Sequence, residues 1–196
     1  MGNYESNTRN ENTDRRIRKT RAALKKSLAI LMQQKSVKDI SVKELTELAD
    51  VNRGTFYLHY KDVFDLLEQS EKDLLDELHA VISPISAETI KNKPALLFEK
   101  VYELCAENAD LVRILLGENG DIKFLNSLNT FLKEKCVNEW SPFIRQTELK
   151  YFDAFFSFLV GGCSSLLQYW FSTGMKQSPK QLAAITVDFL NRNTGE

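Results

Sequence analysis

The sequence predicts an all-α protein. Apolar residues recur at helical spacing along most of the chain, and no stretch alternates apolar and polar residues long enough to indicate a strand. Only four prolines and eight glycines interrupt the 196 residues, so long helices are possible. With 43% hydrophobic and 27% charged residues, the chain has the composition of an ordinary globular protein with enough apolar material for a core.

The N-terminal segment predicts a lead-in followed by a long helix. Residues 1–14 are polar and lack the apolar run of a signal peptide, so we expect a short disordered segment there. A first helix is predicted over residues 15–34, where Leu24, Leu28 and Leu31 form an apolar stripe. The first turns of this helix carry most of its positive charge.

A capping box starts the second predicted helix. Ser41 is followed three residues later by Glu44, and a serine and a glutamate at this spacing can satisfy free N–H groups at a helix N-terminus. This signal predicts a short helix over residues 42–49, with Leu45 and Leu48 facing inward.

Two further caps define the next helices. Asn52 is a good N-cap for a short third helix over residues 53–59. Asp62 can cap a fourth helix, which its apolar residues carry over 62–81 until Pro84 ends the element.

The rest of the chain predicts five more helices. A break is expected at residues 117–120, a stop at Ser141-Pro142, and a capped start at Ser178-Pro179. The expected ranges are 94–108, 110–116, 121–140, 148–173 and 179–191.

Charge is distributed unevenly. Residues 15–61 contain twelve basic and four acidic side chains, a net charge of +8, so the remainder carries −9 to reach the total of −1. Such a split suggests that the basic segment meets a polyanion such as nucleic acid, although a solvated basic face without a partner is the alternative.

The second and third predicted helices, joined by a tight turn behind a basic helix, have the pattern of a helix-turn-helix. The start of the third helix would enter the major groove of DNA, where an arginine can contact a guanine edge. Free N–H groups and polar side chains at the start of the second helix would hold phosphate. The candidate DNA-binding residues are Ser41, Lys43, Asn52, Arg53, Gly54, Thr55, Tyr57, His59 and Lys61.

Several of these residues have a structural alternative. Asn52 could serve only as a helix cap, and His59 is ambiguous. For Tyr60 we favour packing, whereas for Tyr57 we favour a DNA contact. Phe56 and Leu58 are expected to lie in the core.

The run from Val51 to Asp62, VNRGTFYLHYKD, resembles the recognition segment of the TetR family of bacterial transcriptional regulators. The resemblance extends over residues 15–67. The sequence of the C-terminal part is similar to that of a poorly characterised branch of the family that is common in Gram-positive bacteria. It implies that eight of the nine candidates, Asn52 apart, sit at positions that often touch DNA. Many members carry a phosphate-contacting lysine where this chain has Val63.

The resemblance also implies a domain organisation. We expect a disordered lead-in at 1–14, a helix-turn-helix DNA-binding domain at 15–61, and a helical ligand-binding and dimerisation domain at 62–196. In the family, the last two helices pair across a two-fold axis as a four-helix bundle.

The segment 154–175 contains no charged residue, which favours a buried helix over a membrane span because it is rich in small and polar residues. Small residues would let helices approach closely in a dimer. The candidate interface residues are Phe158, Gly161, Gly162, Ser165, Leu166, Tyr169, Ile185 and Phe189.

A ligand pocket is expected among the middle helices, where an aromatic lining would suit an apolar or aromatic compound. For each candidate taken singly, ordinary core packing is the favoured interpretation. The candidates are Phe98, Tyr102, Cys105, Phe124, Leu128, Phe131, Phe152 and Phe156.

The resemblance, together with the uneven charge, predicts a dimeric, cytoplasmic repressor that binds a near-palindromic operator in double-stranded DNA and is released by a small molecule. A coactivator or adaptor that acts through a protein partner is the alternative. An enzyme is disfavoured because the sequence has no Gly-rich phosphate loop, no nucleophile elbow and two histidines. The three cysteines lack metal-ligand spacing and are expected to be reduced, and we expect no cofactor and no metal.

Overall fold

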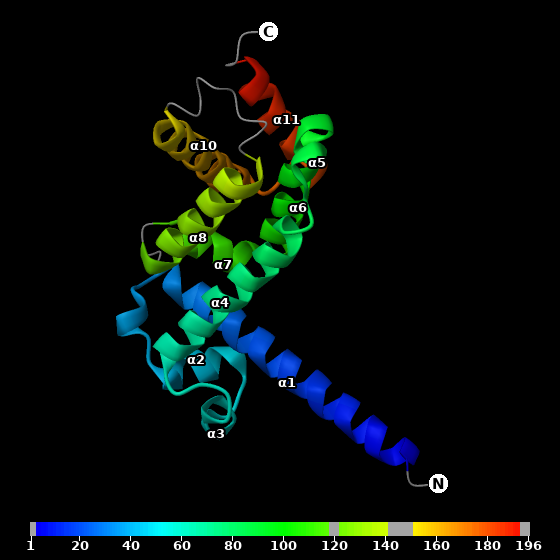
Figure 1. The fold of residues 1–196 in the computed structure, drawn as a ribbon. Coiled ribbons are helices and arrows are strands. Elements are labelled where there is room, and N and C mark those ends of the chain that lie inside the picture. Colours follow the sequence, from blue (N-terminus) through cyan, green and yellow to red (C-terminus); the bar gives the residue numbers. More distant parts are fainter. Residues whose placement is uncertain (1–2, 118–121, 141–150, 193–196) are drawn as a thin grey trace. The chain divides into compact units, whose positions relative to one another are not determined.

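The computed structural model describes residues 3–117, 122–140 and 151–192, and within these ranges every regular element is a helix (Figure 1). The all-α prediction is therefore confirmed. The chain divides into two compact units, residues 1–72 and 73–196. The boundary falls inside the fourth helix, eleven residues later than the expected end of the first domain at residue 61.

The first unit begins with a longer helix than the sequence predicts. Helix α1 spans Asn3–Met32, so it includes most of the segment that we expected to be disordered. A short 3₁₀ turn, η1 (Val37–Asp39), then leads to α2 (Val42–Ala49), α3 (Arg53–Tyr57) and the first part of α4 (Val63–Ile82).

The core of the first unit is built from one face of each helix. Leu24 and Leu28 of α1, Leu45 of α2, Phe56 of α3 and Leu66 of α4 are each at most 1% exposed. Burial of large apolar side chains is the main favourable contribution to folding, so these five residues hold the helices together.

The predictions that Leu48 faces inward and that Leu58 lies in the core are wrong. Leu48 is 47% exposed and Leu58 is 80% exposed. Leu48 lies three residues after the buried Leu45, but an eight-residue helix packed on one side buries only part of that stripe. Leu58 follows the last residue of α3, because the helix ends at Tyr57 instead of the expected residue 59, and its side chain points away from the core.

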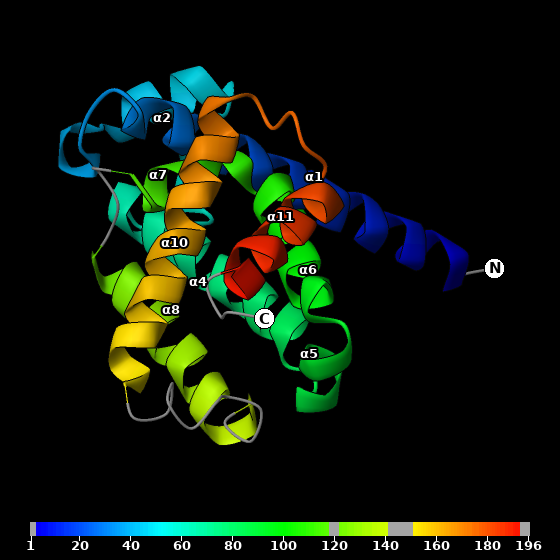
Figure 2. The same cartoon turned by 90° about the horizontal axis from the view of Figure 1, so that it is seen from above.

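Within the described residues, the second unit contains the rest of α4 and seven further elements (Figures 1 and 2). The helix α5 lies in a stretch where the sequence predicts no helix, and Ser86 caps it by accepting a hydrogen bond from the N–H of Thr89 at 3.2 Å. The elements are α5 (Ala87–Asn92), α6 (Pro94–Glu107), α7 (Ala109–Leu115), α8 (Ile122–Lys135) with a π-helical turn η2 (Cys136–Trp140), α10 (Phe152–Ser172) and α11 (Pro179–Arg192).

The observed bounds lie close to the expected ones. Ser178 caps α11 as predicted, because its Oγ accepts from the N–H of Gln181 at 3.2 Å and its own N–H donates to Gln181 Oε1 at 2.9 Å. The expected break at 117–120, the stop at 141–142 and the start of the long helix at 148 fall mainly or wholly outside the described residues.

Helices α6 and α11 lie side by side and pack closely against each other (Figure 2). Tyr102 of α6 and Thr186 of α11 share a buried hydrogen bond between their hydroxyl groups at 2.8 Å. Trp170 of α10 is 1% exposed, lies 6.2 Å from the Tyr102 ring, and donates from Nε1 to the carbonyl of Gln177 at 2.9 Å. Satisfied polar groups therefore accompany the large aromatic rings in this core.

Substitutions of Phe56 and Leu58 test this assignment of the core. Phe56→Ala should destabilise the first unit by about 3–5 kcal/mol, because it leaves a cavity among residues that are fully buried. Leu58→Ala should change the free energy of unfolding by less than about 0.5 kcal/mol. Denaturant unfolding of the two variants beside the wild type checks this, and equal losses would contradict the observed burial.

Candidate nucleic-acid interface and ligand cavity

The helix-turn-helix is set by local capping. The Oγ of Ser41 accepts a hydrogen bond from the N–H of Glu44 at 3.2 Å and starts α2. Asp50 ends α2 in the left-handed conformation, with φ of 51°, and the N–H of Val51 donates to the carbonyl of Thr46 at 3.0 Å. This arrangement satisfies carbonyls at the end of α2 and turns the chain sharply toward α3.

Asn52 acts as the N-cap of α3, as predicted. Its Oδ1 accepts from the N–H of Gly54 at 2.7 Å. A Cβ added at Gly54 would lie 3.1 Å from the same oxygen, so a side chain at position 54 would crowd the cap. Glycine at this position therefore serves the start of the helix as well as leaving the backbone open on the exposed side.

The exposed side of α3 carries the candidate base-reading residues. Arg53 and Gly54 are exposed, Thr55 is half-buried, and Tyr57 is 52% exposed. Phe56, between them, is fully buried and contacts the Tyr60 ring at 5.7 Å between ring centroids. A single buried aromatic residue thus holds this short helix with its polar edge outward.

Tyr60 packs into the first unit, as predicted. It is 2% exposed, its hydroxyl accepts from Nε of Arg21 at 3.0 Å, and the Arg21 guanidinium lies 5.8 Å from its ring centroid. The neighbouring His59 is half-buried, with its ring 6.2 Å from that of Tyr60. Arg21, although basic, is therefore committed to a contact within the protein.

The other candidate contacts lie at exposed positions. The side chain of Lys43 is 70% exposed and lies 3.8 Å from a carboxylate oxygen of Glu47. Lys61 is exposed, and its backbone N–H donates to Asp65 at 2.8 Å. The hydrogen bond from Gln69 and that from Lys61 lower the pKa of Asp65, so this carboxylate stays charged at the start of α4.

Basic residues on α1 extend the positive surface, because Arg15, Arg16, Arg18 and Lys19 are all exposed. Val63, by contrast, is 4% exposed and lies in the core. The position at which the family often carries a phosphate-contacting lysine is therefore a packing position in this chain.

A cavity of about 170 Å³ lies in the second unit, among α4, α6, α7, α8 and α10. It brings together six of the eight candidate ligand residues, namely Phe98, Tyr102, Cys105, Phe124, Leu128 and Phe156. Phe131 does not line it and instead stacks on His79, with ring centroids 3.5 Å apart. Phe152 also lies outside the lining and stacks on Phe156 at 5.8 Å.

Sequence reasoning missed a large part of this lining. The inward face of α4 contributes Leu74, Leu75, Leu78 and Ile82, and their helical spacing was a usable signal. Cys136 and Cys163 also line the cavity, so all three cysteines of the chain meet there. Their separation in sequence gave no indication of this, because three different helical segments supply them.

The cavity is apolar and its thiols are uncharged. Burial raises the pKa of Cys105 to about 12 and those of Cys136 and Cys163 to about 11. Burial likewise raises the pKa of Tyr102 above its usual range. Among the described residues, no group of three or more potential metal ligands comes together.

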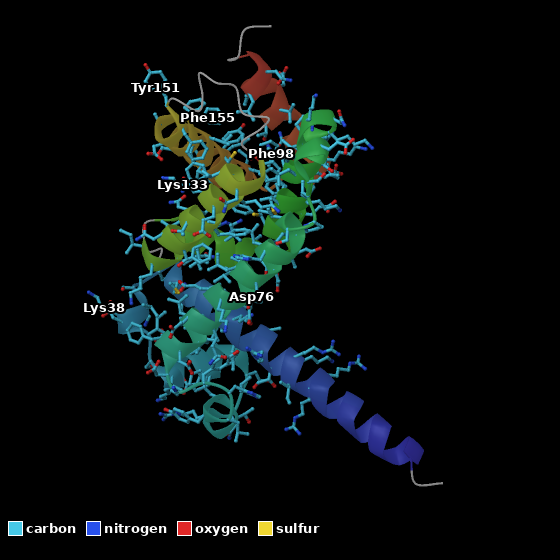
Figure 3. The ribbon with its side chains drawn as sticks, viewed as in Figure 1. Lys38, Asp76, Phe98, Lys133, Tyr151 and Phe155 are labelled. Carbon is cyan, nitrogen blue, oxygen red and sulfur yellow. The ribbon has the colours of Figure 1, made fainter. Side chains whose placement is uncertain are left out.

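A second, more polar hollow of about 680 Å³ lies between α8 and α10. Lys133 of α8, labelled in Figure 3, forms an ion pair with Asp153 of α10 at 2.6 Å. The exposed amides of Asn126 and Asn129 line the same hollow.

The outer faces of α10 and α11 carry exposed apolar side chains. Phe158 is 62%, Tyr169 59% and Phe189 52% exposed, and a Cβ added at Gly161 or Gly162 would meet nothing within 4 Å. Of the remaining candidate interface residues, Ser165 is exposed while Leu166 and Ile185 are half-buried.

By length and composition, α10 is the one helix in the described part of the chain that could cross a membrane, and 22% of its most apolar window is buried. An exposed apolar surface of this kind is typical of a site of contact with another molecule.

The chain is similar to known regulators. Residues 92–192, about half of the chain, match the family model for the C-terminal region of TetR-type transcriptional regulators. A 57-residue segment is 35% identical to the uncharacterised helix-turn-helix-type transcriptional regulator YxbF of Bacillus subtilis, and the match covers 29% of this chain and 15% of the length of YxbF.

Two solved structures share the fold. The fatty acid degradation regulator FadR from Bacillus halodurans superposes with a TM-score of 0.66 at 14% identity, over 87% of this chain and 94% of FadR. A TetR transcriptional regulator from Streptococcus agalactiae 2603V superposes with a TM-score of 0.52 at 22% identity, over 90% of this chain and 96% of that one.

The raised thiol pKa values predict slow alkylation. At pH 8 the native protein should react with iodoacetamide on the order of 100-fold more slowly than the chain unfolded in guanidinium, because the thiolate is the reactive form and burial suppresses it. The rate should rise about tenfold per pH unit up to pH 10. Mass spectrometry at timed intervals measures this, and rapid labelling of the native thiols would contradict their burial.

Proposed function

Because the chain belongs to the TetR family of transcriptional regulators, with a DNA-binding helix-turn-helix, we propose that it is a cytoplasmic repressor released from its operator by a small molecule. The observation that carries the proposal is the geometry of α3, whose buried Phe56 holds an exposed edge of Arg53, Gly54 and Tyr57 outward. A helix that presents its N-terminal residues in this way suits entry into the major groove.

The residues of the interface would divide into two roles. Arg53, Gly54 and Thr55 would read base edges, with Arg53 contacting guanine and Gly54 allowing close approach. Ser41, Lys43, Tyr57, His59 and Lys61 would contact phosphate and fix the register of the helix on the duplex. Asn52 caps α3 through its Oδ1, and its amide nitrogen is available for a DNA contact from the same position.

Dimerisation would supply the second DNA contact. We assign the interface to α10 and α11, where Phe158, Tyr169 and Phe189 are exposed and two adjacent glycines leave room for a closely packed helix. A two-fold dimer would place two α3 helices about 34–36 Å apart, or a multiple of this, on a near-palindromic operator.

Helix α4 would couple ligand to DNA. Its Leu66 belongs to the core of the first unit, while Leu74, Leu78 and Ile82 line the cavity of the second. A ligand that binds one arrangement of α4 better than another shifts the population toward that arrangement. Release of DNA would follow where the favoured arrangement separates the two α3 helices by a distance that does not match the operator.

Substitution of Arg53 tests the reading role. Arg53→Ala should lose about 1–3 kcal/mol of discrimination, roughly 5- to 150-fold, between operator and non-operator DNA. Lys43→Ala should weaken both complexes alike and lower the salt dependence of binding by about one charge.

Fluorescence anisotropy on fragments upstream of the gene, at several salt concentrations and with competitor DNA, measures both effects. Lys180→Ala, an exposed lysine of α11, is the control and should bind as the wild type does. Weak binding by the wild type without preference for any fragment would overturn the proposal.

Substitution of Phe158 tests the dimer. Phe158→Glu should shift the protein toward monomers and weaken operator binding, because it places two charges at an apolar two-fold contact, while leaving the helical content unchanged. Ile122→Glu, at an apolar residue of α8 that is 71% exposed, is the matched control. Analytical ultracentrifugation over a range of concentrations measures the monomer–dimer equilibrium of each variant. An unchanged dimer in Phe158→Glu would place the interface elsewhere.

A further inference from the structure

The apolar cavity and the polar hollow of the second unit share a wall. Leu116, Leu128, Phe156, Val160 and Ser164 line both of them. The two spaces therefore adjoin along these residues, and the chemistry of the two linings constrains any molecule that reaches into both.

The apolar cavity, called the inner compartment from here on, accepts a compact apolar group. Its volume of about 170 Å³ is close to that of a roughly 150 Å³ cavity of leucine, isoleucine and phenylalanine side chains, which stays dry and binds benzene. The hydroxyl of Tyr102 is already bonded to Thr186, and among the described lining residues none is charged. A charged group placed there would lose its hydration without gaining a partner.

The hollow between α8 and α10, called the outer compartment from here on, is larger and offers hydrogen bonds without net charge. Its two charged residues, Lys133 and Asp153, pair with each other at 2.6 Å. The pair is exposed to solvent, with side chains 49% and 81% exposed, and its two charges cancel, so the lining as a whole favours neither an anion nor a cation. The side-chain amides of Asn126 and Asn129, in contrast, are exposed and can each donate and accept.

We propose that the effector is an uncharged amphiphile, with a compact ring or short branched chain in the inner compartment and a larger hydroxyl- or amide-bearing head between α8 and α10. This inference rests on the proposed function, because it names the class of molecule that would release the protein from DNA.

The test uses phenyl β-D-glucoside as the probe and the intact full-length chain. Its parts, benzene and methyl β-D-glucoside, and two charged analogues, phenyl phosphate and phenethylammonium, are the comparisons. Isothermal titration calorimetry should give the glucoside at least tenfold higher affinity than any of the four. Equal or tighter binding of either charged analogue, or no binding of the glucoside, would overturn the inference.

Variants assign the two compartments. Asn129→Ala, at an exposed position, should lower the affinity for the glucoside on the order of 2- to 10-fold and leave the affinity for benzene unchanged, because it removes only contacts to the head. Ser164→Phe should fill the space where the two compartments adjoin and lower the affinity for both the glucoside and benzene. Circular dichroism confirms that the variant folds. Ser127→Ala, exposed on the same helix and outside both linings, is the control.

Operator binding measured with and without the glucoside separates the two proposals. Glucoside binding that leaves the DNA affinity unchanged would preserve the ligand class and refute release by ligand. Release of DNA by a charged compound that also displaces benzene would preserve ligand release and refute the ligand class.

Discussion

The proposed DNA-binding surface depends on the burial of one aromatic side chain. Helix α3 has five residues, and a helix of that length is not stable by itself because its hydrogen bonds cannot offset the cost of ordering the backbone. Phe56, fully buried against Tyr60, and the Asn52 cap supply the missing stability. The residues between these anchors are held in a fixed orientation without having to pack themselves, which leaves them available for contact with another molecule.

The side chains of the second unit are not packed equally closely throughout. Between α6 and α11 the packing is close and the polar groups of Tyr102 and Thr186 are paired. The space among α4, α8 and α10, in contrast, leaves a cavity of about 170 Å³ unfilled. This apolar cavity adjoins the second hollow, whose lining mixes polar and apolar side chains, and the proposed ligand site is built on that pairing.

Charge follows a similar division between structure and function. Arg21 bonds to Tyr60, and Lys35 donates to Glu44 at 2.6 Å, so part of the positive charge in the first unit stabilises the fold. The exposed residues Arg15, Arg16, Arg18 and Lys19 extend that charge along α1, where it can meet phosphate.

The sequence by itself determined the helical class, the caps at Ser41, Asn52 and Ser178, and the helix-turn-helix, because capping and apolar periodicity act over a few residues. Tertiary structure decided which residues of each helix are covered. Leu58 is exposed and Val63 buried, although both are apolar residues beside a helix end. It also decided that three distant cysteines line one cavity and that this cavity adjoins a polar hollow, since both depend on how separate helices meet.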